Sequence, residues 1–205
     1  MLNFNSALLA SAAEFTGRYA PYQGIEIRPA GEQGVFLTAT DQGNVLCLCY
    51  DPLGRGDETI VLLPDSDLLK ACKGIKTAER EIRIDGQTAL VTTFRKSAAN
   101  EAREFPITRS SVPFPPVAEV MQACVERWGA TPAVTATAGR YSSAYIDKAI
   151  KVLQVHESSV VMSCFDGGPL RLQGDNGNVL VVVMPQTALP IPAVPEWTEL
   201  YARRS

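Results

Sequence analysis

The segment GNVLVVVMPQ (residues 177–186) contains an unbroken run of apolar residues, Val179 to Met184, followed by a proline. Successive side chains of a β-strand point to opposite faces of a sheet, so this strand is apolar on both faces. An antiparallel sheet in a small protein commonly turns one polar face to water. The second face must therefore be covered by another part of the chain or by a ligand. The simplest cover is the protein's own tail, QTALPIPAVPEW (residues 186–197), folded back across the sheet.

Length and charge restrict the classes of function. A chain of 205 residues can form one large domain or two small ones, and its net charge of −3 excludes a polybasic nucleic-acid binder, so any DNA contact must be local. No stretch approaches the roughly 18 to 20 apolar residues of a membrane span, which predicts no membrane partner. Residues 1–5 lack the positive charge of a signal peptide, so a cytoplasmic location is expected.

A capped amphipathic helix followed by three short strands recurs along the chain. Helix starts near Ser6, Ser66 and Ser142 suggest a unit of roughly 60 residues. The candidate caps are Asn5 or Ser6, Asp65 or Ser66, and Ser142 or Ser143. The predicted helices span residues 7–17, 65–76, 117–128 and 139–153. The predicted strands span residues 24–29, 34–41, 44–51, 59–64, 80–86, 88–94, a weaker segment ending at 107, 159–166, 169–175 and 178–185. The pattern predicts an α+β fold with the helices on one face of antiparallel sheets.

Clustered prolines at 107–116 interrupt this pattern and suggest a linker, because proline favours extended chain over helix or sheet. Residues 1–110 are predicted to form a domain of two units. Residues 111–190 are predicted to form a shortened domain with one complete unit and an extra helix, and residues 191–205 a proline-rich tail.

Residues suited to metal binding or catalysis are sparse. The five cysteines form no C-x-x-C pair, and Cys47 and Cys49, which share a strand face, have only His156 as a histidine partner in the chain. We therefore expect buried reduced thiols and neither a metal nor a cofactor. The nucleophile-elbow, phosphate-loop and zinc-protease motifs are absent, which favours a non-enzymatic protein.

Four segments resemble the β subunit of bacterial DNA polymerase III, the sliding clamp, specifically its middle and last domains. GVFLTATDQGNVLCLC (34–49) resembles the family's strand–turn–strand with its A-T-D signature. FPPVAEV (114–120) resembles the segment that closes the middle domain, and YSSAYIDKAIKVL (141–153) the helix that opens the final half-domain. NVLVVVMPQ (178–186) resembles the family's C-terminal V-V-M-P-M. A complete clamp domain contains two of the repeated units, whereas this chain has three units and the remnant of a fourth.

The resemblance implies a hydrophobic pocket beside the last strand, where clamps hold short linear peptides of polymerases and repair proteins. Gly43 and Asn44 replace the basic or histidine positions that follow the family's A-T-D. Carried over position by position, the peptide-binding residues are Thr40, Val45, Pro115, Val120, Tyr145, Val182, Val183, Met184 and Pro185.

In clamps, lysines and arginines on the helices contact DNA phosphates without reading sequence. The candidates here are Lys70, Lys73, Lys76, Lys148 and Lys151. The alternative is that these lysines are the ordinary solvated face of amphipathic helices.

The expected function is a sliding-clamp-like processivity factor of DNA replication or repair. It would bind DNA weakly and recruit polymerase or repair proteins. A homo-oligomeric ring and a ring-less peptide-binding module remain the two alternatives, and a scattered catalytic site the third.

Overall fold

The computed structural model describes residues 1–73, 78–95, 100–130, 139–164 and 168–186, with the helix backbone only for residues 127–130. These residues form the helices α1 (Ser6–Ala13), α2 (Ser66–Cys72), α3 (Val117–Ala130) and α4 (Ser143–His156). The strands are β1 (Leu2–Asn5), β2 (Ile25–Pro29), β3 (Val35–Asp41), β4 (Val45–Asp51), β5 (Arg55–Gly56), β6 (Ile60–Leu63), β7 (Glu79–Asp85), β8 (Thr88–Phe94), β9 (Glu101–Pro106), β10 (Thr108–Arg109), β11 (Val161–Ser163), β12 (Leu170–Gln173) and β13 (Val179–Val183).

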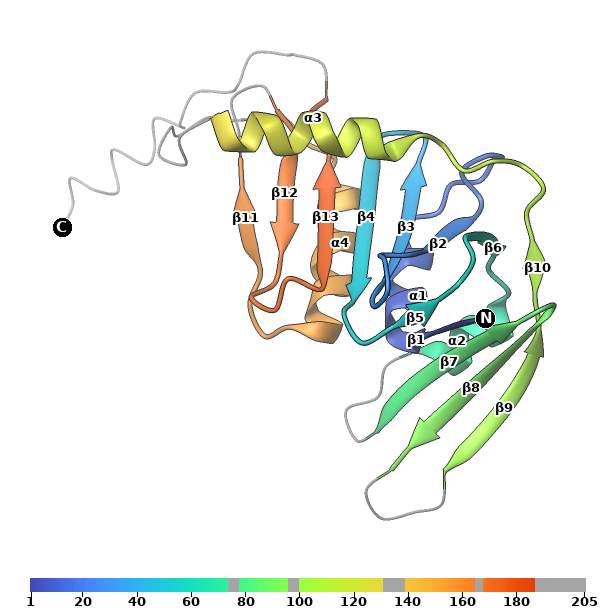
Figure 1. The fold of residues 1–205 in the computed structure, drawn as a ribbon. Helices are drawn as coiled ribbons and strands as arrows, with labels where there is room; N and C mark the ends of the chain where they lie inside the picture. Colours follow the sequence, from blue (N-terminus) through green and yellow to red (C-terminus); the bar gives the residue numbers. More distant parts are fainter. Residues whose placement is uncertain (74–77, 96–99, 131–138, 165–167, 187–205) are drawn as a thin grey trace, which may run out of the picture.

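The strands form two antiparallel sheets (Figure 1). One sheet has the order β5-β1-β7-β8-β9, and the other has the order β10-β6-β2-β3-β4-β13-β12-β11. Every recorded strand pair is antiparallel, so the predicted α+β fold class is confirmed.

The repeated unit predicted from the sequence is present in the structure. Helices α1, α2 and α4 are each followed by three consecutive strands that pair as a meander: β2-β3-β4, β7-β8-β9 and β11-β12-β13. The third meander joins the first through β13, which pairs with β4 from Val179 opposite Cys49 to Val183 opposite Val45. The segment 177–186 therefore lies inside the larger sheet, with a neighbouring strand on each side.

The first two units exchange strands. Strand β1 precedes α1 in the chain but pairs with β7 of the second unit, and β6 precedes α2 but pairs with β2 of the first unit. The short strands β5 and β10 then pair with β1 and β6, so the two units have equivalent strand orders. Leu2 and Phe4 of β1 are buried, although the sequence pattern did not predict this strand.

Side-chain caps begin two of the helices. The Asn5 side chain accepts a hydrogen bond from the Ala7 amide (2.9 Å), and Asp65 accepts from the amides of Asp67 (2.8 Å) and Leu68 (3.2 Å). Ser142 precedes α4 without a side-chain cap bond. α1 ends at Ala13, before the expected stop at Gly17.

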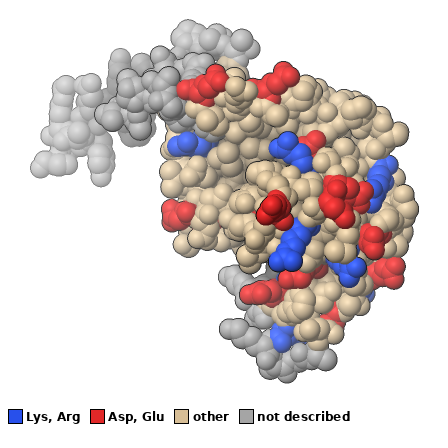
Figure 2. All heavy atoms as spheres, viewed as in Figure 1, with Lys and Arg blue, Asp and Glu red and all other residues tan. Residues whose placement is uncertain are grey.

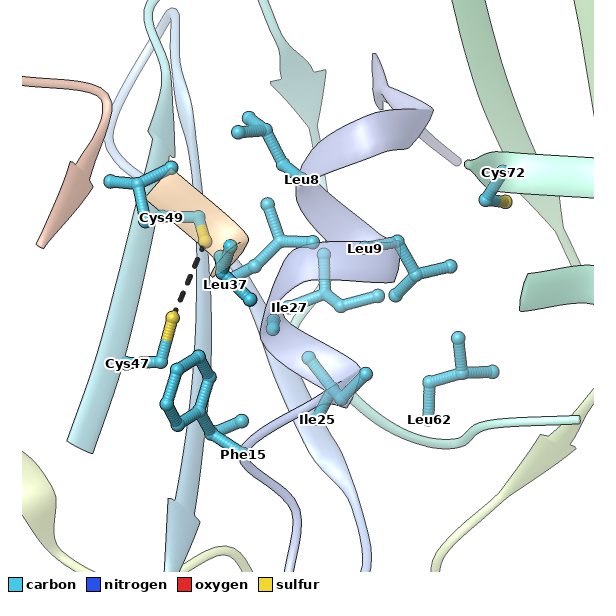
Figure 3. Close-up of a cluster of buried hydrophobic side chains, with 14 of the residues drawn as sticks. Leu8, Leu9, Phe15, Ile25, Ile27, Leu37, Cys47, Cys49, Leu62 and Cys72 are labelled. Atoms are coloured by element: carbon cyan, nitrogen blue, oxygen red, sulfur yellow. Dashed lines mark hydrogen bonds between the residues drawn. The ribbon is translucent and has the colours of Figure 1, made fainter. Parts of the chain in front are cut away.

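The main core joins the helices α1, α2 and α4 to apolar residues of both sheets. Leu8, Leu9 and Phe15 come from α1 and the turn after it, and Figure 3 shows them beside Ile25, Ile27 and Leu37 of the sheet. Cys47 and Cys49 project from β4 into this cluster with their sulfur atoms 3.8 Å apart. Both thiols are buried, and hydrogen bonding to Cys49 together with burial raises the pKa of Cys47 well above its usual range.

The second face of β13 is covered by α3. Val182 packs with Leu46 of β4 and Cys124 of α3, whereas Val181 and Val183 face the main core with α4. In Figure 1, α3 crosses in front of β13 and β4 while α4 lies behind them. The expectation that all helices share one face therefore fails for α3. Residues 187–197 of the tail predicted as the cover lie outside the described residues, as does Lys76.

Candidate functional site

A pocket of about 570 Å³ lies at the end of β13, where three parts of the chain meet. Asn44 comes from the turn between β3 and β4, and Tyr145 from the first turn of α4. Met184 and Pro185 continue from β13. The remaining lining residues are Arg140, Ser142 and Gln186.

The β3–β4 turn shapes one wall of this pocket. Gln42 and Gly43 both have positive φ (50° and 75°), and the Asn44 amide donates to the Asp41 carbonyl (2.9 Å). A two-residue hairpin turn with positive φ at both central positions matches the twist of the flanking strands. This geometry explains a glycine at position 43 and brings Asn44 to the pocket rim.

Tyr145 is held by a hydrogen bond across the pocket wall. Its hydroxyl donates to a carboxylate oxygen of Asp41 (2.8 Å), which joins α4 to the β3–β4 turn. Burial and the neighbouring Asp41 carboxylate raise the pKa of Tyr145, so the hydroxyl remains a proton donor at neutral pH. The ring therefore has a fixed position, with its apolar edge available to line the pocket.

The chain after β13 is held by its backbone. The Met184 amide donates to the Asn44 carbonyl (3.0 Å), and the Gln186 amide donates to the Arg140 carbonyl (2.8 Å). The pocket thus combines apolar surface from Met184, Pro185 and Tyr145 with amide, hydroxyl and guanidinium groups around its rim. Such a combination suits a short peptide, because apolar side chains can enter while the rim binds backbone groups.

The nine peptide-site residues expected from the resemblance do not lie together. Tyr145, Met184 and Pro185 line this pocket, whereas Pro115 lines a separate groove beside α3. Val120 is on α3 and 42% exposed. The others are buried in the protein's own packing: Thr40, Val45, Val182 and Val183.

Asn44, Arg140, Ser142 and Gln186 line the pocket but were not among the expected residues. These residues reach the pocket because of the local backbone path, which is difficult to predict from the amino-acid types alone. Two sequence features could have indicated them: the turn residue Gly43 next to Asn44, and the helix start at Ser142.

The candidate DNA-contacting lysines lie on the helical side of the molecule. Lys73, Lys148 and Lys151 border one cavity of about 480 Å³ between α1 and α4. Acidic Glu14 and Asp147 border the same cavity, and Lys151 forms an ion pair with Asp147 (2.7 Å). Lys70 lies outside this cavity and pairs with Asp67 (2.9 Å).

The opposite face, seen in Figure 2, has basic and acidic side chains interspersed. Among the described residues, neither face therefore presents the continuous basic surface typical of strong DNA binding.

Within the described ranges, no group of three His, Cys, Asp or Glu side chains has the arrangement of a metal site. In the same part of the chain, no helix has both the length and the apolar character required to span a bilayer.

No protein-family model matches the sequence, and no curated protein is significantly similar to it. Solved structures do resemble the fold. A DNA polymerase sliding clamp from Pseudomonas aeruginosa superposes with a TM-score of 0.59 at 14% identity, over 91% of this chain and 67% of the clamp. The DNA polymerase III β subunit of Borrelia burgdorferi superposes with a TM-score of 0.59 at 9% identity, over 92% of this chain and 65% of that subunit. The β subunit of Thermotoga maritima superposes with a TM-score of 0.54 at 12% identity, over 97% of this chain and 67% of that subunit. The chain therefore has the fold of the bacterial DNA polymerase III β sliding clamps and spans about two thirds of their length.

Proposed function

We propose that this protein is a non-enzymatic, sliding-clamp-like protein of DNA replication or repair that recruits polymerase-type partners through the pocket beside Met184. The observation that carries the proposal is the position of that pocket. In a fold shared with sliding clamps, it lies at the end of the strand that resembles the family's V-V-M-P segment. Clamps bind partner peptides beside this strand, so the resemblance implies a peptide site at the same place in this chain.

The chemistry of the pocket is compatible with a short linear peptide. The thioether side chain of Met184 is flexible and adapts to apolar side chains of different shapes. Asn44 and Ser142 can exchange hydrogen bonds with a peptide backbone at the rim. Of the nine residues implied by the resemblance, Tyr145, Met184 and Pro185 carry the proposal, because the others do not line this pocket.

The test is a fluorescence anisotropy titration with a labelled synthetic peptide copied from the clamp-binding segment of a bacterial replicative polymerase. We expect saturable binding that Met184→Asp reduces by at least about tenfold, because a carboxylate would be desolvated against the peptide. Met162→Asp is the matched control, since Met162 lies on β11 and is 56% exposed. Circular dichroism checks that both variants fold. Equal affinity in both variants would refute the pocket assignment.

We also propose a weak, sequence-independent contact with DNA through the helical face. The observation that supports this contact is that Lys73, Lys148 and Lys151 border one cavity. Glu14 and Asp147 border the same cavity and repel phosphates, so we expect the affinity for DNA to be weak. Binding should appear only at low salt, with a shallow salt dependence that reflects few phosphate contacts. Replacing the three lysines with glutamine should abolish retention on a DNA column, while Arg103→Gln on the distant strand β9 should not. Unchanged retention of the triple variant would contradict this contact.

The ring-less peptide-binding module remains the second candidate. The observation in its favour is the character of two edge strands: β9 carries charged residues and β11 has three residues, and such edges disfavour pairing with another chain.

A further inference from the structure

A second groove, which we call the α3 groove, lies between α3 and the sheet and has a volume of about 690 Å³. Helix α3 rests on the sheet along a narrow stripe, formed by Val117, Met121 and Cys124 against β4 and β13. Beside this stripe the groove opens over the outward-facing residues of β2 and β3. It shares no lining residue with the pocket beside Met184.

Much of the α3 groove is apolar. Phe36 and Leu48 form part of its floor, and Met121 and Val125 part of its helical wall. Val125 is 56% exposed although it borders this apolar surface. An apolar side chain in the groove would remove this surface from water, which stabilises a complex.

Two carboxylates face the groove from its opposite walls. Glu26 is on β2, and Glu126 is on α3, where its carboxylate accepts a hydrogen bond from Gln122 (3.0 Å). Burial raises the pKa of Glu26, and the neighbouring Arg28 partly opposes this effect. Among the described residues, the Glu26 carboxylate forms neither a hydrogen bond nor an ion pair.

Arg28 does not neutralise the groove by a direct contact. Its guanidinium carbon lies 5.6 Å from the centre of the Phe36 ring, and Phe36 in turn packs against Tyr50 with ring centres 5.0 Å apart. A guanidinium over an aromatic face is held there by the ring quadrupole. Glu26 therefore remains a half-buried carboxylate that an incoming cation could pair with.

We propose that the α3 groove binds a short segment of a partner protein in which a large apolar side chain lies next to an arginine or lysine. The apolar side chain occupies the space between Phe36 and Met121, and the cation pairs with Glu26 and Glu126. The groove is bounded on one side by the sheet and on the other by α3, so it accepts one face of an extended chain. Its acidic groups disfavour nucleic acid.

The test uses the full chain, labelled with ¹⁵N, and two blocked peptides that differ at one position: acetyl-Ala-Phe-Leu-Arg-Ala-amide and the same sequence with glutamine in place of arginine. We expect chemical-shift changes centred on Phe36, Leu48 and Met121. The arginine peptide should bind about fivefold more tightly, as expected for one partly exposed ion pair. Glu26→Gln should remove this preference, and Glu104→Gln on the exposed strand β9 should retain it.

A second pair of variants tests the apolar contact with the same substitution on the same helix. Val125→Asn should weaken both peptides several-fold, whereas Val120→Asn should not, because Val120 is exposed on α3 but does not line the groove. Shifts elsewhere, equal affinity for the two peptides, or no binding at millimolar peptide would overturn the proposal. Binding that appears only after deletion of residues 187–205 would also overturn it, because the chain's own terminus would then be the occupant.

Discussion

Val182 shows how the second apolar face of β13 is covered. Its side chain is fully buried between Leu46 and Cys124, on the face of β13 opposite the main core. Val182→Ala removes two methyl groups from this contact and leaves a small cavity. We expect it to lower the free energy of unfolding by about 2 kcal/mol, measured by urea denaturation.

Val161→Ala provides the comparison for that measurement. Val161 is on β11 and is 45% exposed, so its replacement should change the free energy of unfolding by less than about 0.5 kcal/mol. Similar losses in the two variants would show that α3 does not cover Val182 in solution.

His156 links the end of α4 to α1. The Ser11 hydroxyl donates to the Ala7 carbonyl (2.9 Å) and lies 2.8 Å from Nε2 of His156, so Nε2 is the donor in that second contact. Burial lowers the pKa of His156 below its ordinary value of 6.5, and the nearby Glu157 carboxylate acts in the opposite direction.

This lowered pKa predicts a pH-dependent stability. A histidine with a lower pKa in the folded state binds fewer protons there than in the unfolded state, so its contribution is complete above pH 6.5 and declines as the pH falls. The free energy of unfolding should therefore fall more between pH 7.5 and pH 5 in the native protein than in His156→Gln. The single histidine should also titrate at lower pH in the native state than in urea, as followed by NMR. Coincident titrations would contradict the assignment.

Among the elements, α3 is held by the narrowest contact. Of its described side chains, Cys124 is the one that is buried, at 6% exposure, and Val117 and Met121 are half-buried beside it. Local opening of such an element requires less free energy than opening of the main core. The thiols report on this difference because Cys164 is exposed while Cys47, Cys49 and Cys72 lie in the core.

Native-state labelling with a thiol reagent should therefore proceed in a defined order. Cys164 should react first, Cys124 second, and Cys47, Cys49 and Cys72 last, also because burial raises the pKa of Cys72 to about 12. Met121→Ala should speed the labelling of Cys124 by about tenfold by weakening the docking of α3. Glu119→Ala, on the exposed side of α3, is the control. A rate for Cys124 equal to that of Cys47 in both variants would show that α3 does not open separately.

Local sequence patterns predicted the elements better than their contacts. The helix starts were predictable because a cap is a short-range interaction, and the structure selects Asn5 and Asp65 from the candidate pairs. The amphipathic pattern predicted the helix at 117–128 but not which sheet face it would cover. Strand β1 was missed because a short strand is stabilised by its distant partner β7, not by its own residues.

The sequence likewise predicted only some of the residues that line the candidate site. Tyr145, Met184 and Pro185 came from the resemblance to clamps and line the pocket. Val182 and Val183 continue the same apolar strand but are buried, since α3 and α4 occupy the two faces of the sheet. The presence of α3 on the outer face could not be inferred from the strand itself.

For the whole molecule, the four edge strands of the two sheets determine whether copies can pair. Strands β5 and β10 have two residues each and β11 has three, whereas the longer β9 carries Glu101, Arg103 and Glu104. Charged and short edge strands disfavour pairing with another chain. We therefore expect a monomer at micromolar concentration, measured by light scattering after size-exclusion chromatography. A stable dimer would favour the ring over the ring-less module.

The exchange of β1 and β6 makes the first two units depend on each other. A break in the backbone between Asp57 and Thr59 would give two fragments, each carrying a strand whose hydrogen-bonding partner belongs to the other. Neither fragment could close its own sheet, and the apolar residues Leu2 and Leu62 would be left in water. Co-expressed fragments should consequently reassemble into a nicked, native-like protein, whereas either fragment produced singly should aggregate or be degraded.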